Sequence, residues 1–287
     1  MTSSPETASG QVPATPATYS YASYMPNPSA ENAIVMQGLT QVFNQKVAVN
    51  NLNLAVKRGE FFGFLGPNGA GKSTTIKMLI GQLRPTQGAA FVSGVNVWSD
   101  PLRARSLMGA LPEQLNLYDR LTGAEFLGLA GNLYNVPRND IPKRAAALLD
   151  VLALGDEAGK LIVDYSVGMK KKVALAAALI HRPDVLFLDE PFEGVDPVSS
   201  RIIRNILQDL TKSGTTIFFS SHIMEVVERL CTRVGIINQG ILVAEGTLDQ
   251  LKQWAGTNSD HTATTLEDVF LQVVGAQTER GGLSWLE

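Results

Sequence analysis

The nine residues GPNGAGKST, at positions 66–74, constrain the fold of this chain more than any other stretch. They match the pattern G-x-x-x-x-G-K-[ST] of a phosphate-binding loop. The apolar residues 60–66 predict a strand that runs into the loop, and residues 74–83 predict a helix after it, which is the context that such a loop requires. The sequence therefore predicts a nucleotide site on an α/β fold; the alternative is a glycine-rich turn.

The residue types in this loop suit a phosphate group. Glycines allow backbone N–H groups to turn toward phosphate oxygens, and the N-terminus of the next helix adds positive potential. We expect Lys72 to reach the β- and γ-phosphates and Ser73 to ligate Mg²⁺. The loop residues predicted to bind the nucleotide are Gly66, Pro67, Asn68, Gly69, Ala70, Gly71, Lys72, Ser73 and Thr74.

A second pattern, VLFLDEPFEGVD, occupies residues 185–196. Its apolar run predicts a buried parallel strand with Asp189 and Glu190 at the carboxyl end, where open α/β sheets bind ligands. Adjacent carboxylates repel each other unless a cation or a catalytic role offsets the cost. We expect Asp189 to orient Mg²⁺ through its water shell and Glu190 to polarise the water that attacks the γ-phosphate. The alternative is a solvated acidic turn that caps the next helix.

The order of predicted elements indicates a mainly parallel sheet with an antiparallel start and a helical insertion. Leu- and Ala-rich helical sequence fills residues 112–181, and strands alternate with helices from residue 185 to 246. A short amphipathic helix is expected at residues 265–274. The earlier strands are predicted at residues 34–43, 47–56, 60–66 and 89–98.

Three regions are expected along the chain. Residues 1–30, rich in Ser, Thr, Ala and Pro, predict a disordered leader. Residues 31–254 are expected to form the nucleotide-binding domain, with a helical subdomain at about residues 115–180. Residues 255–287 are expected to form a C-terminal tail with a short helix.

Composition excludes several classes of protein. The net charge of -3 and the pI near 5.7 give no overall basic field, so no nucleic-acid partner is expected. The single cysteine, Cys231, excludes an internal disulfide and a multi-cysteine metal site. The sequence has no apolar run of the roughly 18 residues that a membrane span needs, and residues 1–16 do not resemble a signal peptide. If the protein works at a membrane, we expect another chain to hold it there.

A third motif, YSVGMKKK at residues 165–172, completes a family resemblance. Together with the two patterns above, it makes residues 33–246 resemble the nucleotide-binding subunit of an ATP-binding-cassette (ABC) transporter, with the motifs in the family's order. YSVGMKKK is similar to the family signature LSGGQ, which faces the γ-phosphate of ATP held by a second subunit. The resemblance implies that Ser166 and the Gly168 amide donate to that phosphate across a dimer interface.

The signature departs from the family pattern. Tyr165, Val167 and Met169 replace the family's leucine, first glycine and glutamine. Because valine does not readily adopt positive φ, we expect Ser166 and Gly168 to make the contact without the residue between them. At least two of the lysines that follow, residues 170–172, are expected to form a solvated cationic face.

The resemblance implies four further site residues. Phe43 would stack on adenine, and Gln114 would approach Mg²⁺ and the attacking water. Asp196 would link the two active sites across the dimer, and His222 would contact the γ-phosphate and help to position water. The alternatives are strand packing for Phe43, a surface position for Gln114, an Asp-Pro turn for Asp196 and a capping or partly buried histidine for His222.

The fold that the resemblance implies is a P-loop NTPase of ABC type, with a mainly parallel sheet, an antiparallel β subdomain and a helical subdomain. The implied function is an ATP-binding and ATP-hydrolysing subunit that powers a membrane transporter. Residues 265–275 resemble the tail of drug, antibiotic or lipid exporters, which favours export. The alternatives are a soluble ABC-type ATPase that is not coupled to a transporter and a regulatory module that holds ATP without turnover.

The cofactors and partners follow from the same resemblance. ATP and Mg²⁺ are the expected cofactors. The expected partners are an integral membrane permease on a separate chain and a second nucleotide-binding subunit, in a homodimer or a heterodimer. The protein would then be peripheral, on the cytoplasmic face of the inner or plasma membrane.

Overall fold

The computed structural model describes residues 26–257 and 265–274. Most of the predicted leader and much of the predicted C-terminal tail lie outside the described residues. The strands are β1 (Asn32–Phe43), β2 (Lys46–Lys57), β3 (Phe61–Leu65), β4 (Gln87–Val92), β5 (Val95–Asn96), β6 (Met108–Leu111), β7 (Val185–Asp189), β8 (Thr216–Ser221), β9 (Arg233–Asn238) and β10 (Ile241–Gly246). The helices are α1 (Lys72–Leu79), α2 (Pro101–Ser106), α3 (Gly123–Leu133), α4 (Ile141–Val151), the 3-10 helix η2 (Ile162–Asp164), α5 (Val167–Leu179), α6 (Pro197–Lys212), α7 (Met224–Leu230), α8 (Leu248–Thr257) and α9 (Leu266–Val274).

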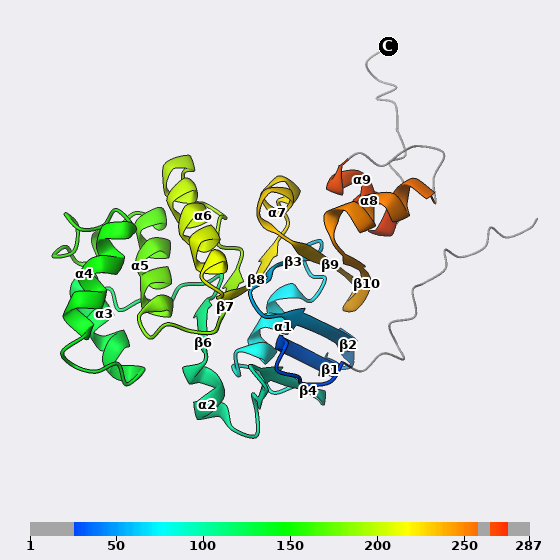
Figure 1. Cartoon of the computed structure of the whole chain (residues 1–287), viewed down its shortest axis with the longest axis horizontal. Helices are drawn as coiled ribbons and strands as arrows, with labels where there is room; N and C mark the ends of the chain where they lie inside the picture. Colours follow the sequence, from blue (N-terminus) through cyan, green and yellow to red (C-terminus); the bar gives the residue numbers. More distant parts are fainter. Residues whose placement is uncertain (1–25, 258–264, 275–287) are drawn as a thin grey trace, which may run out of the picture.

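Two sheets organise these elements. The central sheet has six strands in the order β10-β9-β3-β8-β7-β6, and every pairing is parallel except that of β10 with β9. The second sheet, β2-β1-β4-β5, is antiparallel throughout. In Figure 1, α3, α4 and α5 gather at one end of the molecule, and the antiparallel sheet lies toward the other. The predicted α/β fold class, with an antiparallel part and a helical part, is confirmed.

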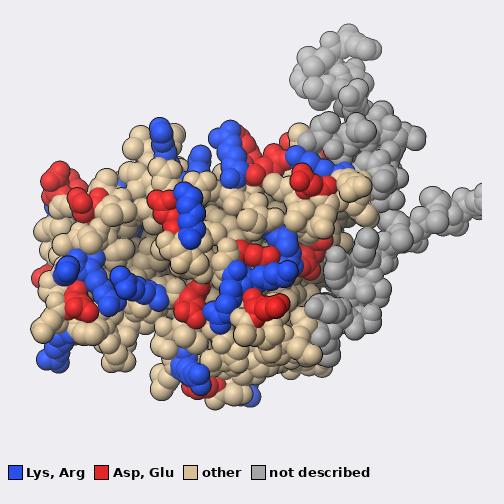
Figure 2. Space-filling model, viewed as in Figure 1, with Lys and Arg blue, Asp and Glu red and all other residues tan. Residues whose placement is uncertain are grey.

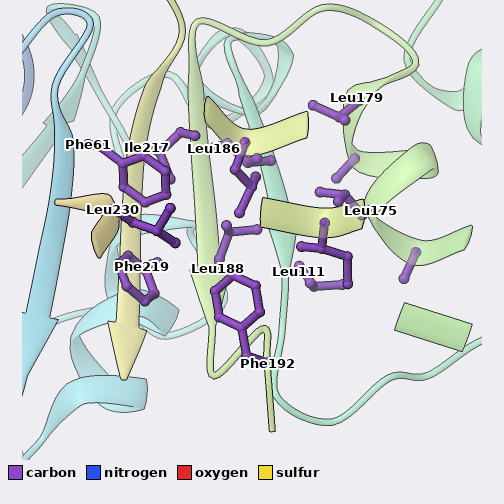
Figure 3. Close-up of a cluster of buried hydrophobic side chains, with 14 of the residues drawn as sticks. Phe61, Leu111, Leu175, Leu179, Leu186, Leu188, Phe192, Ile217, Phe219 and Leu230 are labelled. Atoms are coloured by element: carbon purple, nitrogen blue, oxygen red, sulfur yellow. The ribbon is translucent and has the colours of Figure 1, made fainter. Parts of the chain in front are cut away.

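The central strands β3, β7 and β8 are mostly apolar and fully buried because both faces of the sheet are covered, and polar residues of β7 and β8 gather at their carboxyl ends. In β7, Leu186 and Leu188 belong to a core shared with helices α3 to α9, whereas Val185 and Phe187 belong to a second core with α1, α2 and the antiparallel sheet. Figure 3 shows Leu175 of α5 on the side of β7 from which Leu186 and Leu188 project. A side-chain period of two therefore divides each strand between two cores.

Local sequence signals explain where the helices near the site begin. The Thr122 side chain accepts from the Glu125 N–H, and the Glu125 carboxylate accepts from the Thr122 N–H, which forms a capping box at the start of α3. Ser166 caps α5 by accepting from the Met169 N–H at 3.2 Å. Asp196 caps α6 in the same way. Each cap satisfies backbone donors that have no partner within the helix.

Two predicted boundaries differ from the structure. The strand predicted at residues 89–98 is a hairpin of β4 and β5, because Ser93 and Gly94, with φ of 47° and 81°, form the tight turn between them. The predicted domain end at residue 254 falls inside α8. Buried residues of α8 and α9 pack in the same core as the central sheet, so these helices extend the domain: Leu251, Ala255, Leu266 and Val269.

The face of the molecule shown in Figure 2 is mixed in charge. Lys and Arg side chains are interspersed with Asp and Glu side chains over the face shown in Figure 2. This arrangement agrees with the small net charge of -3. Within residues 26–257 and 265–274, no helix combines the length and the apolar character needed to cross a membrane.

Replacing Leu186 by Ala tests the contribution of the central core to stability. Leu186 is fully buried in β7, and removal of its side chain leaves a cavity, so the free energy of unfolding should fall by about 2–5 kcal/mol. Leu102→Ala is the matched control because Leu102 is 81% exposed, and we expect a change within about 0.5 kcal/mol. Urea denaturation followed by circular dichroism measures both; equal effects would contradict the assignment of the core.

Candidate active site

The phosphate-binding loop connects the carboxyl end of β3 to α1. Gly69 and Gly71 have φ of 80° and 107°, and a Cβ on Gly71 would lie 2.6 Å from the carbonyl oxygen of Ala48. Only glycine fits this conformation and this close approach. The tight loop brings the N-terminus of α1 to a cavity of about 590 Å³.

Most of the predicted nucleotide-binding residues of the loop line this cavity: Asn68, Gly69, Gly71, Lys72, Ser73 and Thr74. Phe43, which is 45% exposed, also lines it. Gly66, Pro67 and Ala70 do not. The carbonyls of Gly66 and Pro67 instead accept from the Lys72 ammonium, at 2.7 and 3.4 Å, and so support the side chain that faces the cavity.

Asp189 meets two hydroxyl groups at the edge of the sheet. Its Oδ1 accepts from the Ser73 hydroxyl at 3.1 Å and from the Ser220 hydroxyl at 2.6 Å. The second contact follows from the parallel pairing of β7 with β8, which places Asp189 opposite Ser220. Ser220 is a site residue that the sequence motifs did not identify.

The Ser73 hydroxyl and the Asp189 carboxylate fit a Mg²⁺ ion. Mg²⁺ prefers hard oxygen ligands and is commonly held by one or two carboxylates plus substrate phosphates and water. Among the residues that the structure describes, no three His, Cys, Asp or Glu side chains form a metal-binding group. This observation is compatible with Mg²⁺ that is shared with a nucleotide, because such an ion needs no cage made only of protein side chains.

Glu190 lies between two other residues that were predicted to belong to the site. Its Oε1 is 3.6 Å from Lys72 Nζ, and its Oε2 is 3.1 Å from His222 Nδ1. Its backbone N–H donates to the Ser220 hydroxyl at 3.1 Å. The carboxylate is 8% exposed, whereas the His222 side chain is 43% exposed. The structure thus brings Lys72, Glu190 and His222 together at the cavity, from three different segments of the chain.

The segment before the helical region places Glu113, and not Gln114, at the cavity. Gln114 is exposed and is not among the residues that line the cavity, whereas Glu113 lines it and accepts from the Ser73 hydroxyl at 3.5 Å. Its only sequence signal is its place beside Gln114. Other lining residues to which the sequence assigned no role are Lys46, Val47, Ala48, Glu193 and Gln239.

Ser166, Gly168 and Asp196 form a second group away from this cavity. A Cβ on Gly168 would lie 2.9 Å from Asp196 Oδ2, so the starts of α5 and α6 are in close contact. Ser166 and Asp196 are exposed. The backbone N–H and the hydroxyl of Ser199 hold the pKa of Asp196 below its usual value. Ser166 and Asp196 therefore offer hydrogen-bonding side chains at the surface, Gly168 is buried between them, and none of the three lines the nucleotide cavity of their own chain.

The prediction that at least two of the three signature lysines face solvent is wrong. Lys171 and Lys172 are buried, with 6% and 5% exposure, and Lys170 is partly exposed. Backbone carbonyls explain the burial: Lys171 Nζ donates to Glu190 and Glu193, and Lys172 Nζ donates to Ala153. Desolvation by burial lowers the pKa of both lysines.

Comparison with known proteins identifies the family. The family described as ABC transporter matches residues 49–193. The chain belongs to the ABC transporter family. The linearmycin resistance ATP-binding protein of Bacillus subtilis is 36% identical over 83% of this chain and 77% of its own length.

Two solved structures of ABC cassettes have the same fold. The ATP-binding subunit of an ABC transporter has a TM-score of 0.78 and 29% identity, over 84% of this chain and 99% of that chain. A dimeric ATP-binding cassette in a post-hydrolysis state, bound to ADP and Pi, has a TM-score of 0.69 and 25% identity, over 75% of this chain and 98% of that chain. The resemblance and the P-loop NTPase fold of ABC type are confirmed, as are ATP binding and the expected function as the ATPase of an exporter-type ABC transporter.

Ser220→Ala tests the hydroxyl that holds Asp189 and Glu190 in this ABC ATPase site. The substitution removes a donor to the buried Asp189 carboxylate and an acceptor for the Glu190 N–H. Loss of a buried hydrogen bond to a charged group should lower the free energy of unfolding by about 1.5–3 kcal/mol. The exposed Ser106→Ala is the matched control, with an expected change within about 0.5 kcal/mol. Urea denaturation compares them, and a neutral Ser220→Ala would contradict the role of this hydroxyl.

Proposed function

We propose that this subunit powers the export of a drug, an antibiotic or a lipid-like compound through a permease on a separate chain. The convergence of Lys72, Glu190 and His222 on one cavity supports the hydrolysis that would supply the energy, because it places a phosphate-binding lysine beside a base that can activate water. The similarity to a protein named for linearmycin resistance supports export. On this proposal the protein is peripheral, on the cytoplasmic face of the inner or plasma membrane.

Each residue at the cavity has a proposed role in ATP hydrolysis. Phe43 stacks on adenine, and Lys72 binds the β- and γ-phosphates. Ser73 and Asp189 hold Mg²⁺, with Asp189 acting through the water shell, and the bound ion would stabilise negative charge on the phosphates. Gln114 reaches the ion and the attacking water when the helical region that it precedes moves toward the cavity.

Glu190 is the proposed general base. Its carboxylate accepts a proton from water while the water oxygen bonds to the γ-phosphorus and the bond from that phosphorus to the oxygen of ADP breaks, giving ADP and phosphate. The 3.1 Å contact with His222 Nδ1 orients the carboxylate, and His222 also contacts the γ-phosphate. Burial strengthens these electrostatic interactions because water screens them poorly there.

The second group of residues supports a dimeric arrangement. Ser166, Gly168 and Asp196 lie outside the cavity of their own chain, and we propose that they meet the γ-phosphate and active site of a second cassette. The dimeric cassette with ADP and Pi shows that a protein of this fold forms a dimer. ATP would close the two subunits, and hydrolysis would reopen them.

Purification from membranes tests the transporter role. The chain, tagged at its C-terminus and extracted in mild detergent, should retain a stoichiometric integral membrane protein, identified by mass spectrometry. Lys72→Ala, which removes a proposed phosphate contact, is purified in parallel as the control. A membrane protein that it also retains binds without the need for nucleotide. Recovery only from the soluble fraction, together with ribosomal or assembly proteins, would contradict the transporter role and favour the soluble ATPase.

Glu190→Gln tests the proposed base and the dimer in one experiment. Loss of the base should lower turnover by about 100-fold to 10,000-fold while ATP remains bound. The variant should therefore accumulate as a dimer in ATP, measured by light scattering after size exclusion.

Adding Ser166→Arg to this variant supplies the control for the interface. Ser166 lies outside the cavity, so the double variant should stay monomeric and keep the same affinity for ATP. A monomeric Glu190→Gln single variant, or a loss of monomer affinity in the double variant, would contradict the proposed interface.

A further inference from the structure

Lys171 is a buried cation that none of the proposed roles uses. It lies on the second turn of α5, which packs against β6 and α6 (Figure 1). Its ammonium donates to the carbonyl oxygen of Glu190 at 2.8 Å and to that of Glu193 at 2.6 Å. A buried lysine loses the hydration of its charge, so these two strong acceptors offset a considerable cost. The lysine binds both ends of the turn that follows β7.

The first residue of that turn, Glu190, has an unfavourable backbone conformation. Glu190 has φ of 47°, a left-handed conformation that is unfavourable for a residue with a Cβ. The turn is closed by the Glu193 N–H, which donates to the Glu190 carbonyl at 3.3 Å. Lys171 donates to the same Glu190 carbonyl, and it therefore holds the peptide plane next to the strained residue.

The orientation of this peptide decides where the Glu190 carboxylate lies. The side chain leaves the backbone between an N–H that is fixed by Ser220 and a carbonyl that is fixed by Lys171. With both peptide planes fixed, the direction of the Glu190 Cα–Cβ bond is set, and it leads to a carboxylate whose oxygens lie 3.6 Å from Lys72 Nζ and 3.1 Å from His222 Nδ1. The hydrogen bonds of the ammonium reach backbone carbonyls and not the carboxylate itself: the ammonium positions the carboxylate through the backbone, and its charge also attracts the carboxylate through space.

The same helix carries the residues proposed to meet the second cassette. Ser166 caps α5, and Gly168 packs against Asp196 at the end of the segment that begins with Glu190. Lys171 lies one turn further along α5. A displacement of the start of α5 would thus reach the Glu190 turn through two charged hydrogen bonds within one chain.

We propose that Lys171 is a positioning residue that fixes the orientation of Glu190 and couples it to the start of α5. The inference rests on the proposed role of Glu190 as the base. It assigns Lys171 to the orientation of the base, whereas nucleotide binding depends on the loop and on Phe43. Removal of the ammonium should therefore lower the rate of hydrolysis far more than the affinity for ATP.

Lys172 provides a matched control on the same helix. It is as buried as Lys171, and its ammonium also donates to a backbone carbonyl, that of Ala153 at 3.3 Å. Ala153 follows α4, in the helical region, and does not line the cavity. Lys171→Met and Lys172→Met remove the same buried charge, but only the first change releases the Glu190 turn.

The experiment compares steady-state ATP hydrolysis of the full chain in the wild type and in these variants. Lys171→Met should lower kcat on the order of tenfold to 100-fold, the loss expected when a reacting group is misplaced by about an ångström, with KM for ATP within about threefold. Lys172→Met should keep kcat within about threefold, even where its stability falls. Hydrogen exchange followed by mass spectrometry should show faster exchange at residues 190–195 in Lys171→Met and not in Lys172→Met.

Lys171→Gln keeps the experiment decisive if Lys171→Met does not fold. Its amide retains hydrogen-bond donors and carries no charge to bury. If Lys171→Met folds, the kcat of Lys171→Gln should lie between those of the wild type and Lys171→Met. If Lys171→Met does not fold, the kcat of Lys171→Gln should lie below that of Lys172→Met. Equal kcat values for the folded Lys171 and Lys172 variants would overturn the inference. If instead the wild type does not hydrolyse ATP, or Glu190→Gln hydrolyses it normally, the proposed role of Glu190 fails and not the role of Lys171 alone.

Discussion

Three buried strands, β3, β8 and β7, end together because parallel hydrogen bonds pair Leu65 with Ser221 and Asp189 with Ser220. The phosphate-binding loop, the two carboxylates and His222 all follow directly from these strand ends. Because the strands are parallel, their carboxyl ends lie at the same edge of the sheet, and the loops that follow them meet there although they are distant in sequence. The position of the site is therefore a consequence of strand register, and the register is held by apolar cores on both faces of the sheet.

The site holds several charged groups in a buried region, where removal of a charge from water costs free energy. Lys72, Asp189, Glu190 and Lys171 are each less than 10% exposed. Every one of them has an oppositely charged or hydrogen-bonding partner, as buried charges require. Such pairs contribute little net stability, since desolvation offsets most of their attraction. The surrounding hydrophobic cores stabilise the fold, and the polar edge of the sheet serves chemistry.

Sequence patterns predicted the parts of the site that depend on consecutive residues. The phosphate-binding loop and the Asp189–Glu190 pair were identified because their chemistry requires particular residue types next to one another. Ser220 and Lys171 were not assigned, since their roles come from contacts with residues 19 to 31 positions away in the chain. The three consecutive lysines looked alike in sequence. Lys171 and Lys172 are buried because the chain after β7 and after α4 offers them carbonyl acceptors, whereas Lys170 stays partly exposed.

The same limit applies to the fold. Alternation of strands and helices predicted the mixed architecture, but no local signal joined the C-terminal helices to the central core. Glu228 of α7 accepts from the Leu266 N–H of α9 and pairs with Lys252 of α8, so one carboxylate connects three helices. Contacts of this kind depend on tertiary packing, which overrides the expectation of a separate tail beyond residue 254.

The signature residues do not line the cavity of their own chain, and this affects how the rate of ATP hydrolysis depends on protein concentration. On the proposed dimer, a dissociated chain lacks the Ser166, Gly168 and Asp196 of a second copy beside its nucleotide cavity, so it holds only half of each composite site. By mass action, the hydrolysis rate per chain then rises with concentration until association is complete. A permease that holds two copies together would remove this dependence, because it keeps the local concentration of the second copy high at any dilution.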